Sequence, residues 1–332
     1  MILRTLKSNR AINLLIVPAI VIIFWLKDLF SPFSYQFYPG ENSNLLYTPI
    51  NSFTENLDFV RVLISLVLVI IIAVLVQVVN DRYMFIRVRT KLPSVLFVII
   101  VSGFTDLHTL HPVFPATIFL LLAIYSLFDT FEKTKPYSNV FNAGFFIGVG
   151  TLFYLNLIVI LPAFFIGISI LTRESSWRKY IILLIGILVP VFFAFSYVVI
   201  TGQTSEILTV ITQNIVTPVN HFRSNIPLHV FLSILILLTI TGTIYILRQY
   251  DSKKVSTRKY FTIFFIIFML SLLSFTFIPV TSLEILVIIA IPITYLISNL
   301  FVFARSRFWS ELLFLLLLGI VIFMQFSDSL FN

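Results

Sequence analysis

The chain has 332 residues, of which 59% are hydrophobic and only 11% are charged, whereas roughly a quarter of the residues in soluble domains are charged. A soluble protein of this size could not bury so much apolar surface, so the composition excludes an ordinary water-soluble domain and indicates a protein embedded in lipid. The 22 basic residues outnumber the 14 acidic ones, but they are divided among short loops, which argues against nucleic-acid binding. The absence of cysteine excludes disulfides, thiolate metal sites and a cysteine nucleophile.

Apolar runs follow one another along the whole chain, most of them near the roughly 20 residues that a helix needs to cross a bilayer. The first run follows the basic start MILRTLKSNR without a small-residue cleavage site, so we expect a retained first helix. The period-two alternation of a transmembrane barrel is missing. We predict an all-α fold, a polytopic transmembrane helical bundle in one integral membrane domain (1–332), with spans at about 12–30, 59–79, 93–107, 113–131, 138–153, 156–172, 180–200, 228–247, 260–278, 282–302 and 309–327.

Charge decides the number of spans and their direction. With eleven spans and a cytoplasmic N-terminus, every basic residue except Lys27, Arg61 and Arg223 lies on the cytoplasmic side, as the positive-inside rule requires. Merging the third run with the fourth, or the fifth with the sixth, would reverse every later loop and destroy this bias. We therefore predict a multi-pass protein of the cell inner membrane, with its histidines and most of its carboxylates facing the periplasm.

Local chemistry supports both of these breaks. Pro112 and Pro115 interrupt the region between the third and fourth runs, because proline removes a helix donor. Tyr154 and Asn156 offer a polar turn between the fifth and sixth runs. The third, fifth and sixth runs have only about 15–17 residues, roughly 23–25 Å of helix, against a core of about 30 Å. Such short helices thin the bilayer or line a recessed cavity, so the middle hairpins are the expected site region.

Small residues and polar segments complete this outline. Gly144, Gly148 and Gly150 form a small face in the fifth run, which suits close helix packing. Two longer segments, 31–58 and 201–227, mix aromatic, polar and acidic residues. We expect both on the outer side, as short helices at the membrane surface.

The first candidate site is the polar stretch 104–112, where the short third run turns outward. It contains Asp106, His108 and His111, and ionisable groups at membrane depth are costly, which favours a function. On a helical turn the two histidines share a face, so with Asp106 they could bind a metal or relay protons. The alternative is a polar helix-end loop at the water interface.

The second candidate site is the entrance to the second run, where Glu55, Asp58 and Arg61 are spaced three residues apart. A carboxylate here could act as a general base or help to hold a divalent cation. The alternative is a helix start, where acidic residues are favoured and an Asp58–Arg61 pair adds support.

The third candidate site lies in the second long outer segment, at 220–225, which contains His221 and Arg223. An arginine beside aromatic residues could grip a lipid-linked phosphate, and the alternative is an interfacial anchor. Glu284, near the outer end of the tenth run, is a weaker candidate.

All of the histidines are expected on the outer side, where four imidazoles could hold a non-haem iron. Ligand sets of this kind usually come from helix interiors, whereas two of these residues lie in loop-like sequence, so we assign no metal site. The four are His108, His111, His221 and His229.

The cytoplasmic loops carry little chemistry of their own. The segments 81–91 and 250–259 are expected to be solvated basic loops that attract anionic lipid. No P-loop, Rossmann glycine pattern or kinase-like motif occurs in the chain, which excludes ATP hydrolysis by this chain alone.

The chain resembles an uncharacterised family of multi-pass membrane proteins from Bacteroidota, catalogued as a domain of unknown function. The similar stretches are NVFNAGFFIGVGTLFY at 139–154 and RESSWRKY at 173–180, followed by Gly186 and Pro190. The resemblance covers most of the chain and implies no established activity and no functional residue. Some members carry a carotene-cleaving oxygenase label, so an iron-dependent carotenoid oxygenase is a remote alternative function.

A looser, architectural likeness is to the glycosyltransferases that use lipid-linked sugar donors. Those enzymes have a long outer loop after the first helix, an acidic residue in or near it, and short helix hairpins in the middle. This chain has the loop 31–58, the acidic residues Glu41, Glu55 and Asp58, and the short third to sixth runs. Similarity of architecture is a weak warrant for function.

The first hypothesis is therefore a glycosyltransferase or polymerase of the cell envelope that acts on a polyprenyl-phosphate-linked sugar at the periplasmic face. Glu55 or Asp58 would activate the acceptor or hold a divalent cation, the one cofactor we consider. Asp106 and His108 would line the cleft as further catalytic residues. The expected substrate-binding residues are Arg61, His111, His221 and Arg223, with Arg223 on the carrier phosphate.

The second hypothesis is a non-catalytic membrane partner, or a carrier of a small molecule or lipid, that uses the same cavity for binding only. A transporter should show discontinuous helices in matching halves, and we see no such pair. In every version the lipid bilayer is the main partner. The first hypothesis requires the outer candidate residues to converge on one outward-facing cavity.

Overall fold

The computed structural model is helical, with no strand among the residues that it describes, which are Leu3, Leu6, 12–33, 35–38, 40–174, 176–216, 226–278, 283–304 and 306–331. The α-helices are α2 (Ile12–Phe30), α3 (Thr48–Thr54), α4 (Asp58–Tyr83), α5 (Leu92–Ser102), α6 (Val113–Phe128), α7 (Tyr137–Phe153), α8 (Leu161–Leu171), α9 (Trp177–Thr201), α10 (Thr204–Val216), α11 (Ile226–Arg248), α12 (Val255–Phe277), α13 (Ile285–Phe303) and α14 (Arg307–Phe331). Short 3-10 helices add η1 (Thr105–Leu107), η2 (Leu155–Ile160) and η4 (Tyr250–Ser252).

Six helices in the described part of the chain are long and apolar enough to cross a membrane: α4, α9, α11, α12, α13 and residues 308–326 of α14. Shorter apolar helices cover α5, α6 and the segment 155–171. The all-helical membrane class that composition predicts is therefore confirmed. Each predicted run overlaps a helix, but eleven crossings and a cytoplasmic N-terminus stay predictions.

One of the predicted runs is wrong in detail. The third was expected to continue to 107, yet α5 ends at Ser102, where the Gly103 N–H bonds back to the Ile100 carbonyl at 3.1 Å. The polar residues that follow favour a turn over more apolar helix. The sixth matches the apolar helix 155–171, whose first residues form η2. The α-helix then begins at Leu161, because Pro162 fits the first turn, where its missing donor has no partner to lose.

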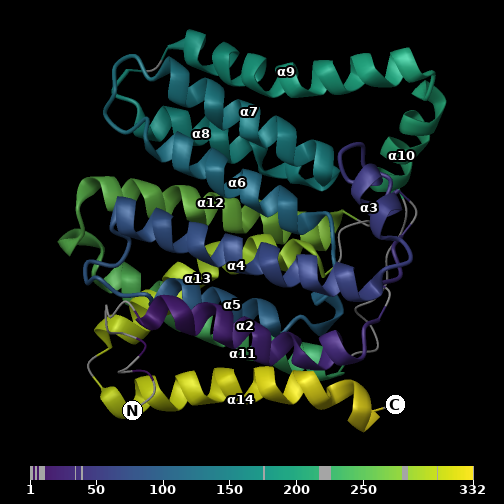
Figure 1. Ribbon diagram of the computed structural model, residues 1–332. Coiled ribbons are helices and arrows are strands. Elements are labelled where there is room, and N and C mark those ends of the chain that lie inside the picture. The colour runs from purple at the N-terminus through teal and green to yellow at the C-terminus, as the bar shows by residue number, and fades with distance from the viewer. Residues whose placement is uncertain are drawn as a thin grey trace.

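The helices lie roughly side by side in a stack, with α9 on one outer side and α14 on the other (Figure 1). Two helices form the centre of this stack. All eleven residues of α5 are buried, and 89% of the apolar window of α13 is buried. The two helices pack against each other and are flanked by α2, α4, α11 and α12. These neighbours shield α5, which at roughly 17 Å is too short to span the hydrocarbon core alone.

Both ends of the stack collect connecting segments. We call one of them the α3 end; it holds α3, α10, the loop 31–47 and the loop 103–112 (Figure 1). Bonds between distant segments tie it together: Tyr47 donates to the Leu110 carbonyl at 3.0 Å, and Asn214 donates to the Gly40 carbonyl at 2.8 Å. The loops 84–91, 129–136 and 249–254 lie at the opposite end.

Close packing of α7 on α9 explains the small face of the fifth run. A Cβ added to Gly148 would lie 2.6 Å from Pro190 Cγ and 2.7 Å from the Ile187 carbonyl oxygen. A Cβ on Gly144 would overlap the Leu183 carbonyl, and one on Gly186 would overlap the Phe141 carbonyl. Small residues let two membrane helices bring their backbones together, where dispersion attraction holds them.

We predict that Gly144→Ala destabilises the protein by about 1–3 kcal/mol, because the new methyl group meets backbone that cannot move aside as a side chain can. Thermal unfolding of the purified protein in detergent would measure the change. Gly319→Ala in α14 is the matched control, since nothing lies within 4 Å of its added Cβ. Equal unfolding temperatures for the two variants would contradict this account of the α7–α9 contact.

Candidate functional site

The loop between α5 and α6 carries the most deeply buried polar residues of the α3 end. It turns through η1 and ends at Pro112, which precedes the first residue of α6. The side chains of His108, Thr109 and His111 are fully buried. A buried polar side chain costs free energy unless it finds partners, so the partners of the two histidines define the local chemistry.

His108 is paired with Asp28 from the end of α2. Its Nδ1 atom lies 2.6 Å from Asp28 Oδ2, and its Nε2 atom lies 3.2 Å from the Ser102 carbonyl oxygen. A carbonyl only accepts, so Nε2 carries a hydrogen. The short contact at Nδ1 then requires a second proton, on either the imidazole or the carboxylate. The pair is therefore electrically neutral as a whole and holds one shared proton.

Three further contacts fix His108 in place. The Trp25 ring stacks on the imidazole with centroids 3.9 Å apart. The His108 carbonyl accepts from Ser65 Oγ at 2.6 Å and from Trp25 Nε1 at 3.0 Å. Since Trp25 belongs to α2 and Ser65 to α4, the histidine joins two helices to the loop.

His111 is paired with Glu41, and this pair has a different net charge from the His108–Asp28 pair. Its Nε2 atom lies 2.6 Å from Glu41 Oε1, while its Nδ1 atom accepts the Val113 N–H at 3.1 Å. With Nδ1 accepting, the single ring proton sits on Nε2, and the imidazole is neutral beside an anionic carboxylate. Glu41 Oε2 also accepts the Tyr38 N–H at 3.0 Å. This pair thus carries a net negative charge, unlike the pair of His108.

A third carboxylate lies beside an aromatic hydroxyl at this end. Glu284, only 1% exposed, accepts the Tyr154 hydroxyl at 3.0 Å. Burial, together with the nearby charges of Glu41 and Glu284, raises the pKa of Tyr35 well above its ordinary value. The Tyr35 hydroxyl is buried without a hydrogen-bond partner among the described residues. The Tyr35 hydroxyl therefore stays protonated.

Arg61 is the buried cation of the α3 end, at 5% exposure. Its guanidinium donates to the Thr54 carbonyl at 3.1 Å and to Asn51 Oδ1, and it lies 5.7 Å from the centre of the Phe37 ring. Each of these partners is neutral, and no carboxylate pairs with Arg61 among the described residues. A guanidinium has five N–H donors, so this one keeps free donors and an uncompensated charge.

The structure separates the predicted site residues into groups. Glu55 is exposed at the end of α3, and Asp58 is half-buried at the first position of α4. Asp106 is half-buried in η1, near enough to Tyr35 to raise the pKa of its hydroxyl. His221 and Arg223 lie outside the described residues.

The two histidines and Arg61 have partners other than those that sequence spacing suggests. Asp106 is not the carboxylate partner of either histidine, because Asp28 and Glu41 reach them from distant segments. Arg61 bonds to α3 rather than to Asp58, since the chain before α4 folds back over it.

The described histidines do not form a metal site. Both nitrogens of His108 and of His111 already have protein partners, and His229 is exposed on α11. No group of three or more His, Asp or Glu side chains in the described part of the chain is placed to hold a metal.

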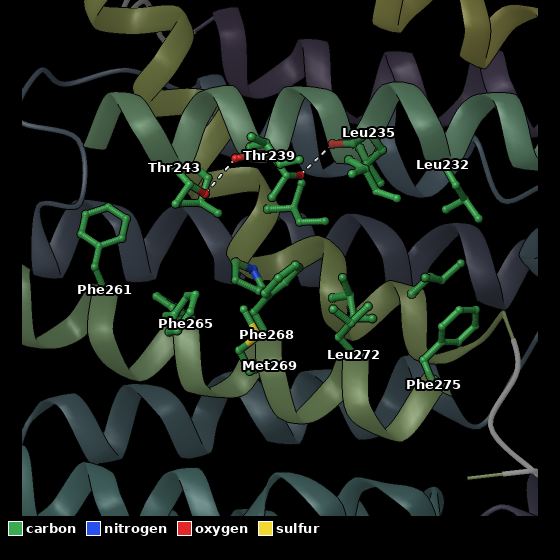
Figure 2. Close-up of a pocket in the computed structure, with 18 of the residues that line it drawn as sticks. Leu232, Leu235, Thr239, Thr243, Phe261, Phe265, Phe268, Met269, Leu272 and Phe275 are labelled. Atoms are coloured by element: carbon green, nitrogen blue, oxygen red, sulfur yellow. Dashed lines mark hydrogen bonds between the residues drawn. The ribbon is translucent and has the colours of Figure 1, made fainter. Parts of the chain in front are cut away.

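An apolar groove of about 480 Å³ lies between α11 and α12, with α13 as its floor (Figure 2). It runs from Phe261 near one end to Phe275 and Leu286 near the other. Its polar lining atoms are satisfied within the helix, because Thr239 donates to the Leu235 carbonyl at 2.7 Å and Thr243 to the Thr239 carbonyl at 2.8 Å. The groove therefore presents hydrocarbon and aromatic surface only.

The groove opens because α11 and α12 both pack on α13 and leave a gap between them. Leu286 at one of its ends is two residues from the buried Glu284. The apolar groove and the polar α3 end are thus adjacent at the start of α13. Hydropathy could not have located this groove, because its residues look like any other membrane-facing helix surface.

We predict that His108 and Asp28 are energetically coupled. His108→Ala leaves a buried carboxylate without its partner, and Asp28→Ala leaves a buried imidazole without its partner, so each should lower the free energy of unfolding by about 3–5 kcal/mol. The double variant should lower it by clearly less than the sum of the two single effects, because it removes both polar groups together. Thermal or denaturant unfolding in detergent would measure this double-mutant cycle. Asp28→Ala combined with Glu55→Ala serves as the additive control, and additivity in the His108 cycle would contradict the pairing.

A family model described as a family of unknown function (DUF6427) matches residues 43–330 of the chain. No curated protein matches the chain, and no solved structure matches it.

Proposed function

We propose a function from the geometry of this chain, which belongs to the DUF6427 family of unknown function: it is a multi-pass membrane protein that binds a lipid chain in the groove between α11 and α12. The observation that carries the proposal is the groove itself, about 480 Å³ in volume and lined by apolar side chains. This is the lipid-carrier form of the second sequence hypothesis.

The position of the groove along two candidate membrane spans favours lipid as its occupant. Its walls, α11 and α12, are both candidate membrane spans. Wall residues such as Ile236, Ile240 and Phe265 are more than half exposed on the same helices, and exposed apolar surface of this kind belongs in hydrocarbon. Whatever enters the groove from the surrounding medium at that depth is a lipid chain.

Selectivity in such a groove comes from shape. Lipid tails are as apolar as leucine, so moving a chain from the bilayer into the protein gains little from the hydrophobic effect. Packing against the aromatic side chains and the irregular floor at Pro292 supplies the dispersion contacts instead. A polar headgroup at the α3 end would add hydrogen bonds near Glu284.

The arrangement of helices supports eleven crossings with the α3 end outside. Each predicted run overlaps a helix, and these helices lie roughly side by side in the stack (Figure 1), as eleven crossings would require. Lys27 and Arg61 are the only described basic residues at the α3 end, and the other described ones cluster at the opposite end. The positive-inside rule then favours a cytoplasmic location for that opposite end, in line with the proposed inner-membrane location.

We predict that Leu272→Trp, which fills the groove, lowers lipid binding about tenfold, because overpacking a fitted site costs roughly 1–3 kcal/mol. Leu272 lines the groove, whereas its neighbour Leu273 does not, although both are partly exposed on α12. Leu273→Trp is therefore the matched control. Native mass spectrometry of each purified variant would measure the lipid retained in detergent. Equal retention by the two variants would refute a groove-bound lipid.

A second candidate function, transfer of a sugar from a polyprenyl-phosphate carrier, is favoured by Arg61. A buried guanidinium with spare donors and no acidic partner in the described part of the chain is suited to a phosphate. Asp58 and Glu55 flank it in sequence and remain the candidates for activating an acceptor or holding a divalent cation. Asp106 and His108 would support the cleft, and His111, His221 and Arg223 would bind substrate.

We predict for this candidate that Arg61→Gln lowers transfer about 100-fold, as the loss of one preorganised charge at a reacting group does. Arg61→Lys should retain part of the activity. The envelope glycolipids of cells expressing each variant, together with Asp58→Ala and Asp106→Ala, would be profiled by mass spectrometry. Asp251→Ala, an exposed acid at the opposite end, is the control. Unchanged profiles in stably expressed variants would exclude the transferase.

A further inference from the structure

A second cavity, of about 390 Å³, lies at the opposite end from the α3 end, where α4 turns back toward α5. It is lined by Asn80, Asp81, Met84, Ile86, Arg87, Val88, Arg89 and Lys91. We propose that this cavity, which is separate from the groove, binds the phosphate-bearing headgroup of a membrane lipid.

The loop that forms the cavity is held at both ends. Met84 adopts a left-handed conformation with φ of 51° and closes α4 through a bond from its N–H to the Asn80 carbonyl. Phe85 is fully buried and stacks on Tyr295 with centroids 4.8 Å apart. At the far end the Thr90 carbonyl accepts from Gln77 Nε2 at 2.9 Å. These contacts fix the backbone of the residues between Phe85 and Thr90.

Three basic residues occupy every second position of this loop. Arg87, Arg89 and Lys91 are two residues apart, and buried Thr90 lies between the last two. The carboxylate of Asp81 is already engaged, because Lys91 Nζ lies 3.1 Å from it and Gln77 Nε2 lies 2.7 Å from it. Both arginines are exposed and have no acidic partner among the described residues, so the cavity carries two uncompensated guanidinium charges.

The buried Lys253 makes this end still more electropositive. Its ammonium donates to Asn299 Oδ1 at 3.0 Å and lies 5.3 Å from the centre of the Phe261 ring, and both partners are neutral. Burial, with a contribution from the Arg87 charge, lowers the pKa of Lys253 to about 8. An anion in the cavity would offset the repulsion between Arg87 and Lys253.

Two apolar residues indicate a lipid rather than a soluble anion. Met84 and Val88 line the same cavity and are 45% and 49% exposed. The cavity also lies at the end of α4, a 26-residue candidate membrane span, so it sits where headgroups lie. Guanidinium groups bind phosphate oxygens in bidentate pairs, while the apolar pair suits the glycerol and first methylenes of a lipid.

The test uses the purified full-length protein in detergent, titrated with phosphatidylglycerol and followed by thermal shift and native mass spectrometry. Salt near 1 M shortens the Debye length to about 3 Å, which suppresses diffuse attraction and leaves direct contacts. The variant Arg87→Gln/Arg89→Gln should bind phosphatidylglycerol about tenfold more weakly than the wild type. The matched control is Arg248→Gln/Lys254→Gln, which removes two exposed basic residues at the same end but outside the cavity.

Each outcome decides the proposal. Weaker phosphatidylglycerol binding by the cavity variant alone supports it, and so does equal binding of diacylglycerol, which lacks phosphate, by the cavity variant and the control variant. Equal binding of phosphatidylglycerol by the two variants would overturn it. A shift by inorganic phosphate as large as the shift by phosphatidylglycerol would assign the cavity to a soluble anion and overturn the lipid assignment. In a Leu272→Trp background, in which the groove is filled, Arg87→Gln/Arg89→Gln should weaken phosphatidylglycerol binding by the same factor as in the wild type, which separates the cavity from the groove.

Discussion

Hydrocarbon offers no hydrogen bonds, and the rest of this structure follows from that constraint. Backbone groups satisfy one another within helices, and polar side chains must either reach the ends of the stack or bond inside the protein. The fully buried histidines of the loop 103–112 bond inside the protein, to carboxylate partners. The threonines of α11 do the same within their own helix. Both the polar α3 end and the dry groove are products of this one requirement.

The two histidine–carboxylate pairs show how one kind of pair takes two net charges in a single loop. The difference comes from the second nitrogen of each ring. In His108 it meets a carbonyl, which needs a hydrogen, and in His111 it meets an N–H, which supplies one. The loop therefore holds a neutral pair next to an anionic pair. Because both rings are enclosed, these pairs position the α3 end rather than offer free groups to a substrate.

The sequence predicts the helices well and the pairings poorly. Apolar runs are local, so they locate nearly every helix, and prolines and polar turns mark most of their ends. The partner of His108 is 80 residues away and that of His111 is 70 residues away, and no spacing rule spans such distances. Asp106 was chosen because it is near in sequence, yet the fold brings Asp28 and Glu41 closer. Spacing from Glu55 and Asp58 points to Arg61, whereas the groove depends on how α11 and α12 rest on α13.

The glycine contact between α7 and α9 also bears on local unfolding of the protein. Only a few residues of α9 are buried, among them Gly186 and Pro190, and α7 supplies most of its contact. Its other face carries exposed Phe192, Phe193 and Phe195. Peripheral elements open at a lower free energy than the centre does. Helix α9 can therefore separate as its own unit while α5 and α13 stay packed.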